Sequence, residues 1–222
     1  AIADELAAFI ERRSRAASEG LARERGPFTH WKGSRWERQG LAPLRNATTT
    51  TIAPTGTLSI LAGCSGGIEP LYAVSFVRQV LEGERLVEVP PLFVQMARDG
   101  GWYSDELMRR VADRGSVRGL DAVPPEAQRL FATAYDVAPE WHLRMQAAVQ
   151  RHVDAAVSKT VNLPATATVD DIRAIYLAAW KAKVKGITVY RYGSREGQVL
   201  SYAAPEPVLA QADTTFSGGC VG

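Results

Sequence analysis

The first part of the chain carries apolar side chains at a helical spacing. Apolar residues fall at roughly helical spacing, at Ile2, Leu6, Phe9, Ile10 and Leu21, with arginine, glutamate and serine among the residues between them. This period places the apolar side chains on one face of an α-helix. The pattern predicts an amphipathic helix that ends near Arg25, where a Gly-Pro pair follows and opposes further helix.

A second pattern occupies the stretch Asn46–Pro70. It begins with β-branched residues over Thr48–Ile52, which favour a pleated strand. Pro54 ends the strand, and the Thr-Gly-Thr that follows is typical of a tight turn. The short apolar run Leu58–Ala62 then predicts the start of a helix.

The turn before that helix is a candidate anion site. A helix start exposes amide N–H groups without intrahelical partners and carries partial positive charge, so it suits an anion. Glycine in the turn lets a ligand approach the backbone, and the two threonines add hydroxyl donors. On the pattern alone, a simple connecting turn remains the alternative. The candidate residues are Pro54, Thr55, Gly56, Thr57, Leu58 and Ser59.

The second half of the chain alternates helices and strands. Ser104 resembles an N-cap for a helix over about Asp105–Arg114, and Pro139 opens a helix predicted to reach about Val157. A strand over Ser158–Leu163, a helix with a capping box at Thr168, and a strand over 187–190 follow. Helix, strand, helix and strand in succession predict an α/β fold with a largely parallel sheet.

Composition and charge exclude several classes of function. The net charge of +2 gives no electrostatic reason to expect nucleic acid or a membrane surface as a partner. The aromatic and basic segment Phe28–Gly40 could stack bases, but an irregular loop held by its aromatic side chains is the favoured interpretation. Two cysteines make no disulfide framework, which favours a cytoplasmic location. The three histidines show no metal-ligand spacing, and no metal site is predicted.

Three motifs resemble one known family in the same order along the chain. They are RNATTTTIAPTGTLSILAGCSGGIEPLYA, WHLRMQAAVQRHVDAAVSKTVNLP and KGITVYRYGSREGQVL. All three resemble class II, adenosylcobalamin-dependent ribonucleotide reductases, and the likeness covers roughly residues 1–200. It implies that residues 1–202 form the C-terminal portion of the ten-stranded reductase α/β barrel. Residues 203–222, rich in Ala, Pro and Gly, are expected to form a flexible tail.

The resemblance also implies an activity. The expected reaction is reduction of ribonucleotides, with diphosphates as the expected substrates, to 2′-deoxyribonucleotides by a radical mechanism. Adenosylcobalamin is the implied cofactor, and a thioredoxin-like or dithiol reductant and the remainder of the reductase polypeptide are the implied partners. This chain would supply the substrate-phosphate segment, around Thr55 and Gly56, and the closing strands of the barrel. The absence of an initiator Met fits a fragment.

Parts of the family's chemistry are missing from this sequence. No Asn-x-Cys-x-Glu pattern, which carries the thiyl cysteine in the family, is present. Cys220 is a possible redox thiol of the tail and is expected to be accessible, whereas Cys64 is interpreted as a small buried hydrophobe that reacts slowly. Glu69 is expected to cap nearby amides rather than act as an acid or base. Tyr192 replaces an aspartate that is usual in the family.

Two alternatives of other classes stay open at this point. One is a non-catalytic nucleotide- or phosphate-binding α/β module, and the other is a purely structural α/β domain. An Asn-x-Cys-x-Glu loop upstream in the same gene would favour the reductase over both.

Overall fold

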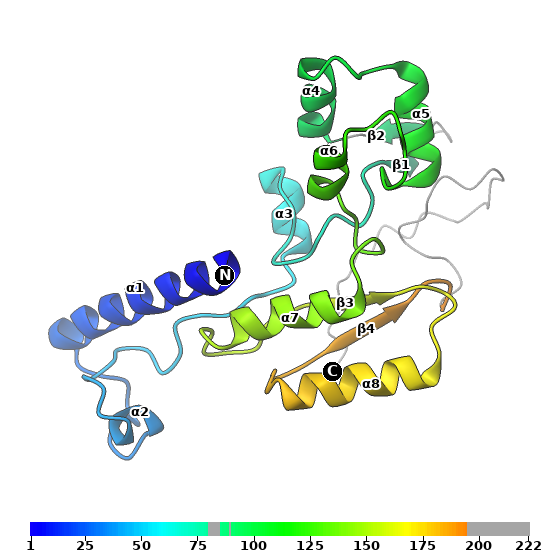
Figure 1. The fold of residues 1–222 in the computed structure, drawn as a ribbon. Helices are drawn as coiled ribbons and strands as arrows, with labels where there is room; N and C mark the ends of the chain where they lie inside the picture. Colours follow the sequence, from blue (N-terminus) through cyan, green and yellow to red (C-terminus); the bar gives the residue numbers. More distant parts are fainter. Residues whose placement is uncertain (80–84, 89, 195–222) are drawn as a thin grey trace.

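The computed structural model describes residues 1–79, 85–88 and 90–194 of the chain (Figure 1). The predicted tail at 203–222, including Cys220, lies outside the described residues. In chain order the elements are α1 (Ile2–Arg25), α2 (Arg35–Arg38), α3 (Gly56–Ala62), β1 (Phe76–Gln79), β2 (Arg85–Glu88), α4 (Pro91–Asp99), α5 (Asp105–Arg114), α6 (Pro125–Leu130), α7 (Pro139–Gln150), β3 (Thr160–Leu163), α8 (Val169–Lys181) and β4 (Thr188–Arg191).

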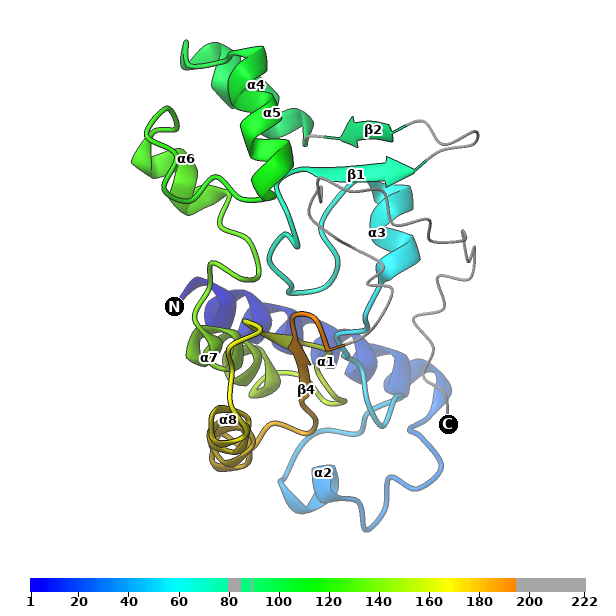
Figure 2. The ribbon, with the colours of Figure 1, turned by 90° about the vertical axis from the view of Figure 1, so that its right-hand side faces the viewer.

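Helices α4, α5 and α6 form a group beside the antiparallel pair β1–β2 (Figure 2). Ser104 caps the N-terminus of α5, as the sequence predicts, by accepting a hydrogen bond from the Leu107 amide. Gly115 ends the helix in a left-handed conformation. The rings of Phe93 and Phe131 meet edge to face with centroids 5.0 Å apart. The largest core cluster of the described residues lies here and includes Val74, Phe93, Val111, Val117, Leu120 and Val123.

A parallel β3–α8–β4 unit forms the other end of the molecule (Figure 1). Asn162 on β3 pairs in register with Tyr190 on β4. The capping box that begins α8 is present, because the Thr168 hydroxyl accepts from the Asp171 amide and the Asp171 carboxylate accepts from the Thr168 amide. The predicted βαβ arrangement is therefore confirmed for this unit.

Helix α7 ends at Gln150 rather than near Val157 as the sequence predicted. The chain leaves the helix because the segment after it bonds to residues 49–52. The Ala155 amide donates to the Thr50 carbonyl (3.0 Å), and the Ser158 amide donates to the Ile52 carbonyl (2.8 Å). These bonds satisfy backbone groups that a longer helix would have used.

The predicted strand over Thr48–Ile52 is reduced to one bridge, between Ile52 and Val157 in parallel orientation. The threonine side chains of this segment form hydrogen bonds to Asp154 in place of a regular strand ladder. Thr49 donates from both its amide and its hydroxyl to the Asp154 carboxylate, at 2.8 and 3.0 Å. Thr50 accepts a hydrogen bond from the Asp154 amide at its hydroxyl (3.0 Å). Side-chain bonding of this kind competes with a regular ladder.

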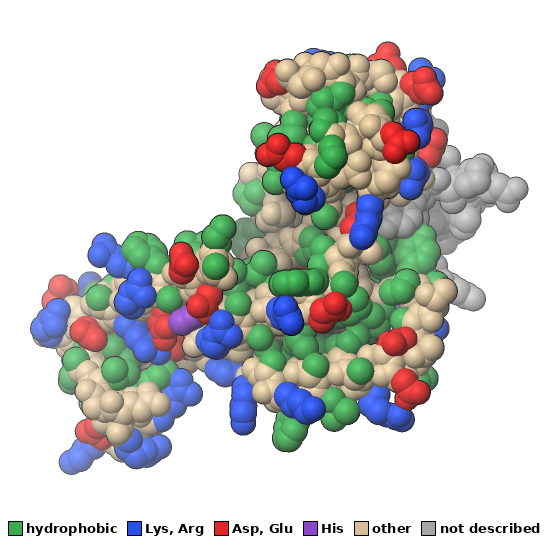
Figure 3. Space-filling view, viewed as in Figure 1, with side chains coloured by type: hydrophobic (Ala, Val, Ile, Leu, Met, Phe, Trp, Pro, Cys, Tyr) green, Lys and Arg blue, Asp and Glu red, His purple; other side chains and the backbone are tan. Residues whose placement is uncertain are grey.

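Helix α1 forms over the predicted range, but most of its apolar stripe faces outward. Ala7 packs with Val149 and Val157, whereas Leu6 is 58% exposed and Phe9 is 52% exposed. The outer face of α8 is similar, since Trp180 is 76% exposed. Figure 3 shows apolar side chains reaching the surface over both helices. Among the described residues, no helix is both long and apolar enough to span a membrane.

Candidate functional site

The turn before α3 has an unusual backbone conformation at Thr55. Its φ of 51° lies in the left-handed region, and among the described non-glycine residues only Lys183 shares this feature. An L-residue in that region costs on the order of 1 kcal/mol. The strain turns the chain sharply, so α3 begins at Gly56, and the Thr55 carbonyl accepts the Ser59 amide at 2.9 Å.

Two glycines form the wall behind this turn. The Gly67 amide donates to the Thr55 hydroxyl oxygen at 3.0 Å. A Cβ at Gly66 would lie 3.3 Å from the Pro54 carbonyl oxygen, a tight contact that the two backbone segments could accept only by moving apart by a few tenths of an ångström. Because the Thr55 oxygen already accepts one bond, its hydroxyl proton remains available for donation to a ligand.

The first amides of α3 are available for a ligand. In the part of the chain that the structure describes, the amides of Gly56, Thr57 and Leu58 donate no hydrogen bond. Leu58 is 64% exposed, so this helix start faces solvent. The structure therefore brings the six predicted residues together in one open turn with unpaired donors, which is an arrangement that can bind an oxyanion.

A buried cluster of charged and polar side chains lies beneath the glycine wall, and Lys159 is at its centre. The Lys159 ammonium donates to Glu69 Oε2 at 2.5 Å and to His142 Nδ1 at 2.8 Å, and it also bonds to the Thr160 carbonyl. The other Glu69 oxygen accepts the Thr160 amide at 2.6 Å. Lys159 and His142 are 2% and 1% exposed.

Burial shifts the pKa values of the two most deeply buried groups, Lys159 and His142. It lowers the pKa of Lys159, and the Glu69 carboxylate opposes that effect. It also lowers the pKa of His142, and the positive charge of Lys159 adds to the lowering. The network therefore assigns a neutral His142 that accepts at Nδ1 and donates from Nε2 to the Ala134 carbonyl (2.9 Å).

The cluster connects the candidate anion site to the sheet. Glu69 lies two residues after Gly67 of the glycine wall, and its amide donates to the Gly66 carbonyl at 3.2 Å. Its carboxylate holds both Lys159 and the first residue of β3. The expectation that Glu69 caps nearby amides is correct only in part, because the one amide that it accepts belongs to Thr160, far away in the sequence, and its other oxygen pairs with Lys159. Lys159 was missed, because a single lysine next to a β-branched strand is usually a solvent-exposed residue.

The cysteine expectations have different outcomes. Cys64 is exposed, so its interpretation as a buried hydrophobe is wrong. Helix α3 is too short to cover it, because the chain turns back at Gly63 (φ 62°) directly after the last helical residue. Cys220 lies outside the described residues, and its role stays a prediction.

The remaining candidate groups are held in structural contacts. His152 lies between two carboxylates, with Nδ1 2.9 Å from Glu11 and Nε2 3.1 Å from Asp4. Tyr192 packs edge to face on Tyr135, with ring centroids 5.5 Å apart, so an aromatic contact occupies the position where the family usually has aspartate. Within the described ranges, no three His, Cys, Asp or Glu side chains are grouped to hold a metal ion.

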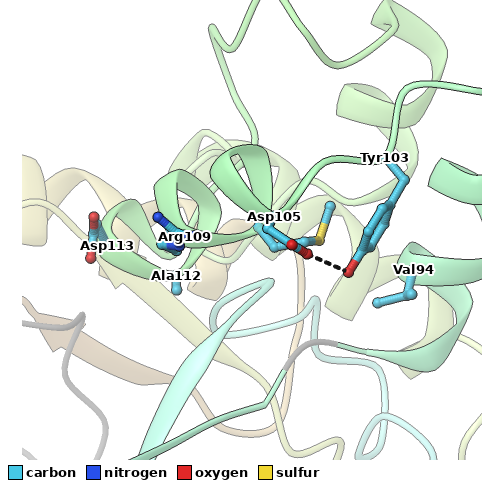
Figure 4. A pocket seen from close by; sticks show the side chains of 7 residues that line it. Val94, Tyr103, Asp105, Arg109, Ala112 and Asp113 are labelled. Carbon is cyan, nitrogen blue, oxygen red and sulfur yellow. Dashed lines mark hydrogen bonds between the residues drawn. The ribbon is translucent and has the colours of Figure 1, made fainter.

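A hollow of about 620 Å³ lies against α4 and α5, apart from the α3 turn (Figure 4). Tyr103 donates from its hydroxyl to Asp105 at its edge (3.2 Å), and the Arg98 guanidinium lies over the Tyr103 ring. None of the six predicted anion-site residues lines this hollow.

Comparison with known proteins identifies the family. The ribonucleotide reductase, barrel domain family matches residues 40–190. The chain is 62% identical over 221 residues to the vitamin B12-dependent ribonucleoside-diphosphate reductase of Mycobacterium tuberculosis, covering 100% of this chain and 31% of that protein. It is 48% identical over 205 residues to the protein of the same name from Thermoplasma acidophilum, covering 92% of this chain and 26% of that protein.

A solved structure supports the fold. The class Id ribonucleotide reductase alpha subunit of Actinobacillus ureae superposes with a TM-score of 0.71 at 21% identity, over 86% of this chain and 34% of that chain. The chain thus spans between about a quarter and a third of the length of these relatives. The prediction of a portion of the reductase α/β barrel is confirmed, and the chain belongs to the ribonucleotide reductase barrel-domain family.

Proposed function

We propose that this chain supplies the substrate-phosphate segment of a reductase that converts ribonucleoside diphosphates to 2′-deoxyribonucleotides. The names of the Mycobacterium and Thermoplasma relatives support the reaction, its diphosphate substrates and its dependence on vitamin B12. Membership of the barrel family does not favour the alternative of a non-catalytic phosphate-binding module. The observation that carries the local assignment is the group of unpaired amides at Gly56, Thr57 and Leu58 beside the Thr55 hydroxyl.

The diphosphate would be held mainly by neutral donors. Backbone N–H groups at a helix start and an available hydroxyl proton bind phosphate oxygens without a nearby cation. The Thr55 backbone strain and the glycine wall fix these donors before the substrate arrives. Lys159 and Glu69 hold the wall in place from below and do not contact the substrate.

The cofactor of the proposed reaction is adenosylcobalamin, which when bound supplies the radical. We assign none of the described residues to the cofactor. The chain also lacks the Asn-x-Cys-x-Glu pattern that carries the thiyl cysteine in the family. Hydrogen abstraction at the ribose would therefore use residues outside this chain.

The partners follow from the same proposal. The remainder of the reductase polypeptide would cover the exposed apolar side chains of α1 and α8, such as Leu6 and Trp180, because large apolar faces are seldom left in water. A thioredoxin-like or dithiol reductant would restore the reducing thiols, with Cys220 as a possible relay in the tail. We place the reaction in the cytoplasm, with neither nucleic acid nor membrane as a partner.

The test uses the intact gene product that carries this segment, assayed for deoxynucleotide formation with adenosylcobalamin and a dithiol. Thr55→Val keeps the shape of the side chain and removes the hydroxyl. A hydrogen bond to a charged group contributes about 1.5–3 kcal/mol, so we expect KM for the diphosphate to rise by roughly tenfold or more while kcat changes little.

Thr166→Val on an exposed loop is the matched control and should leave KM unchanged. An unchanged KM in Thr55→Val would contradict the phosphate assignment. No deoxynucleotide from the unmodified protein under these conditions would contradict the proposed reaction itself. The 222-residue chain alone should form no product.

A further inference from the structure

A small hollow of about 170 Å³ lies where α1 and α2 meet the segments that follow α7 and α8. Five of the side chains that line it are lysines or arginines, and we call it the basic hollow. These side chains belong to Arg15, Arg35, Arg151, Lys183 and Lys185. Figure 3 shows basic side chains over α1, α2 and the adjoining segments, interspersed with acidic ones.

Two carboxylates also line the basic hollow, and both are engaged. The Asp154 carboxylate accepts the Thr49 amide and hydroxyl at 2.8 and 3.0 Å. Glu11 contacts Arg15 at 2.8 Å and His152 Nδ1 at 2.9 Å. Outside the hollow, Asp4 contacts Arg151 at 2.7 Å.

Three cations of the basic hollow have no carboxylate partner in the described ranges: Arg35, Lys183 and Lys185. They come from α2 and from the loop between α8 and β4. The Lys185 ammonium donates to the Asp154 backbone carbonyl, which leaves its charge uncompensated. Because the two carboxylates of the hollow are engaged with other groups, these like charges repel one another, and a bound anion would reduce that repulsion.

Lys183 is held in this position against its backbone preference. It follows the C-cap of α8 with φ 61°, and the Val184 amide returns to the Ala179 carbonyl at 3.3 Å, the bonding pattern of a Schellman motif. Glycine is the favoured residue at this position because it adopts positive φ without strain. A lysine at a strained site beside unpaired cations suggests that its charge has a use.

Two of the three arginines of the basic hollow, Arg15 and Arg35, are held by one aromatic ring. Arg35 and Arg15 lie 3.8 and 5.1 Å from the ring centroid of Trp36, which is itself buried and donates to the Ala47 carbonyl at 2.8 Å. Trp36 thereby brings guanidinium groups of α1 and α2 to one place. Guanidinium groups bind planar or tetrahedral oxyanions with several directed hydrogen bonds.

We propose that the basic hollow binds a small phosphate-type anion. Its volume is well below the ~300 Å³ at which sites for drug-sized ligands begin, so it fits a phosphate or diphosphate group but not a buried nucleoside. The bound anion would tie α1 and α2 to the loops that precede β3 and β4. By joining these segments, the bound anion would stabilise the contact of α1 and α2 with the loops before β3 and β4.

The basic hollow is separate from the proposed substrate turn. Residues 150–154 and 183–185 precede β3 and β4, so they lie at the amino ends of these parallel strands. Helix α3 instead follows the carboxyl end of the segment whose Ile52 pairs in parallel with Val157. In Figure 1 the C-terminal ends of α7 and α8 lie on the side of α1 and α2. This inference therefore does not depend on the proposed function.

The test is titration calorimetry of the intact gene product with inorganic phosphate at constant ionic strength. Lys183→Gln removes the charge, and Lys183→Gly removes the charge and the backbone strain together, so it guards against a folding defect. Lys181→Gln, on the exposed end of α8, is the matched control. We expect saturable binding that weakens about fivefold in both Lys183 variants and by less than about twofold in Lys181→Gln.

Thr55→Val separates this site from the substrate turn and should leave phosphate binding at the basic hollow unchanged. In the Thr55→Val protein, competition of pyrophosphate and of adenosine diphosphate with phosphate is then measured. Displacement by pyrophosphate alone would identify a free anion as the ligand, and displacement by adenosine diphosphate would identify the phosphate group of a nucleotide. The proposal is overturned if binding does not saturate, if the Lys183 and Lys181 variants behave alike, or if Thr55→Val abolishes binding.

Discussion

The ammonium of Lys159 lies 2.8 Å from Nδ1 of His142, and both side chains are almost completely buried. A lysine that donates to a histidine keeps that histidine neutral, because a second positive charge at this distance would repel the first. Glu69 supplies the compensating charge, at 2.5 Å from the ammonium. One buried cation therefore joins α7, β3 and the loop that supports the proposed substrate turn.

Replacing Lys159 with methionine should strongly destabilise the fold. The change leaves the buried His142 and the partly buried Glu69 without their shared partner, and breaking one side of a buried pair costs about 3–5 kcal/mol. We expect the lower end of this range, because a third of the Glu69 side chain remains exposed. Chemical denaturation measures the loss, and the exposed Lys181→Met provides the comparison. A loss below about 1 kcal/mol would contradict the central role of Lys159.

Stability should fall as the solution is acidified below about pH 6.5. Burial and the Lys159 charge lower the pKa of His142 below its ordinary value of 6.5, so the unfolded chain takes up a proton before the folded chain does. The loss is at most about 1.4 kcal/mol per pH unit and continues down to the lowered pKa. Denaturation at several pH values measures it.

His142→Gln should remove this component of the pH dependence, whereas the same change at the exposed His30 should leave it in place. Equal slopes below pH 6.5 in the unmodified protein and in His142→Gln would show that another group is responsible.

Lys183→Gly should raise stability. The position has a φ of 61°, which glycine adopts without strain, so the exchange is expected to stabilise the protein by about 1 kcal/mol. Lys181→Gly, in the last turn of α8, should instead destabilise it by about 1 kcal/mol, because glycine is a poor helix former. Thermal or chemical unfolding measures the change in the free energy of unfolding of each variant and checks its expected direction. A destabilised Lys183→Gly protein in phosphate-free buffer would mean that the lysine contributes contacts of its own.

Cys64 should react readily with a thiol reagent in the folded protein. Its side chain is exposed, so access does not limit the reaction. Timed alkylation followed by peptide mass analysis gives the rate, and the same reaction in denaturant gives the reference. We expect the two rates to agree within about tenfold. Strong protection of Cys64 in the intact gene product would indicate that a part of the polypeptide outside the described residues covers it.

The sequence by itself determined those helix ends and turns that depend only on hydrogen bonds between residues a few positions apart. Ser104 marks the start of α5, and the Thr168 capping box marks the start of α8, because a capping side chain bonds to an amide three residues away. The turn at Thr55 was also visible, since proline, threonine and glycine impose local backbone preferences.

Features that depend on distant partners required the folded arrangement. Helix α7 ends early because its continuation bonds to residues 49–52, about a hundred positions away. Glu69 and Lys159 lie 90 positions apart, and neither residue by itself indicates an ion pair. Cys64 sits in an apolar-looking segment, yet its exposure follows from where the short helix α3 ends. Local hydrogen bonds can be inferred from neighbouring residues, whereas burial and charge pairing depend on which segments the fold brings together.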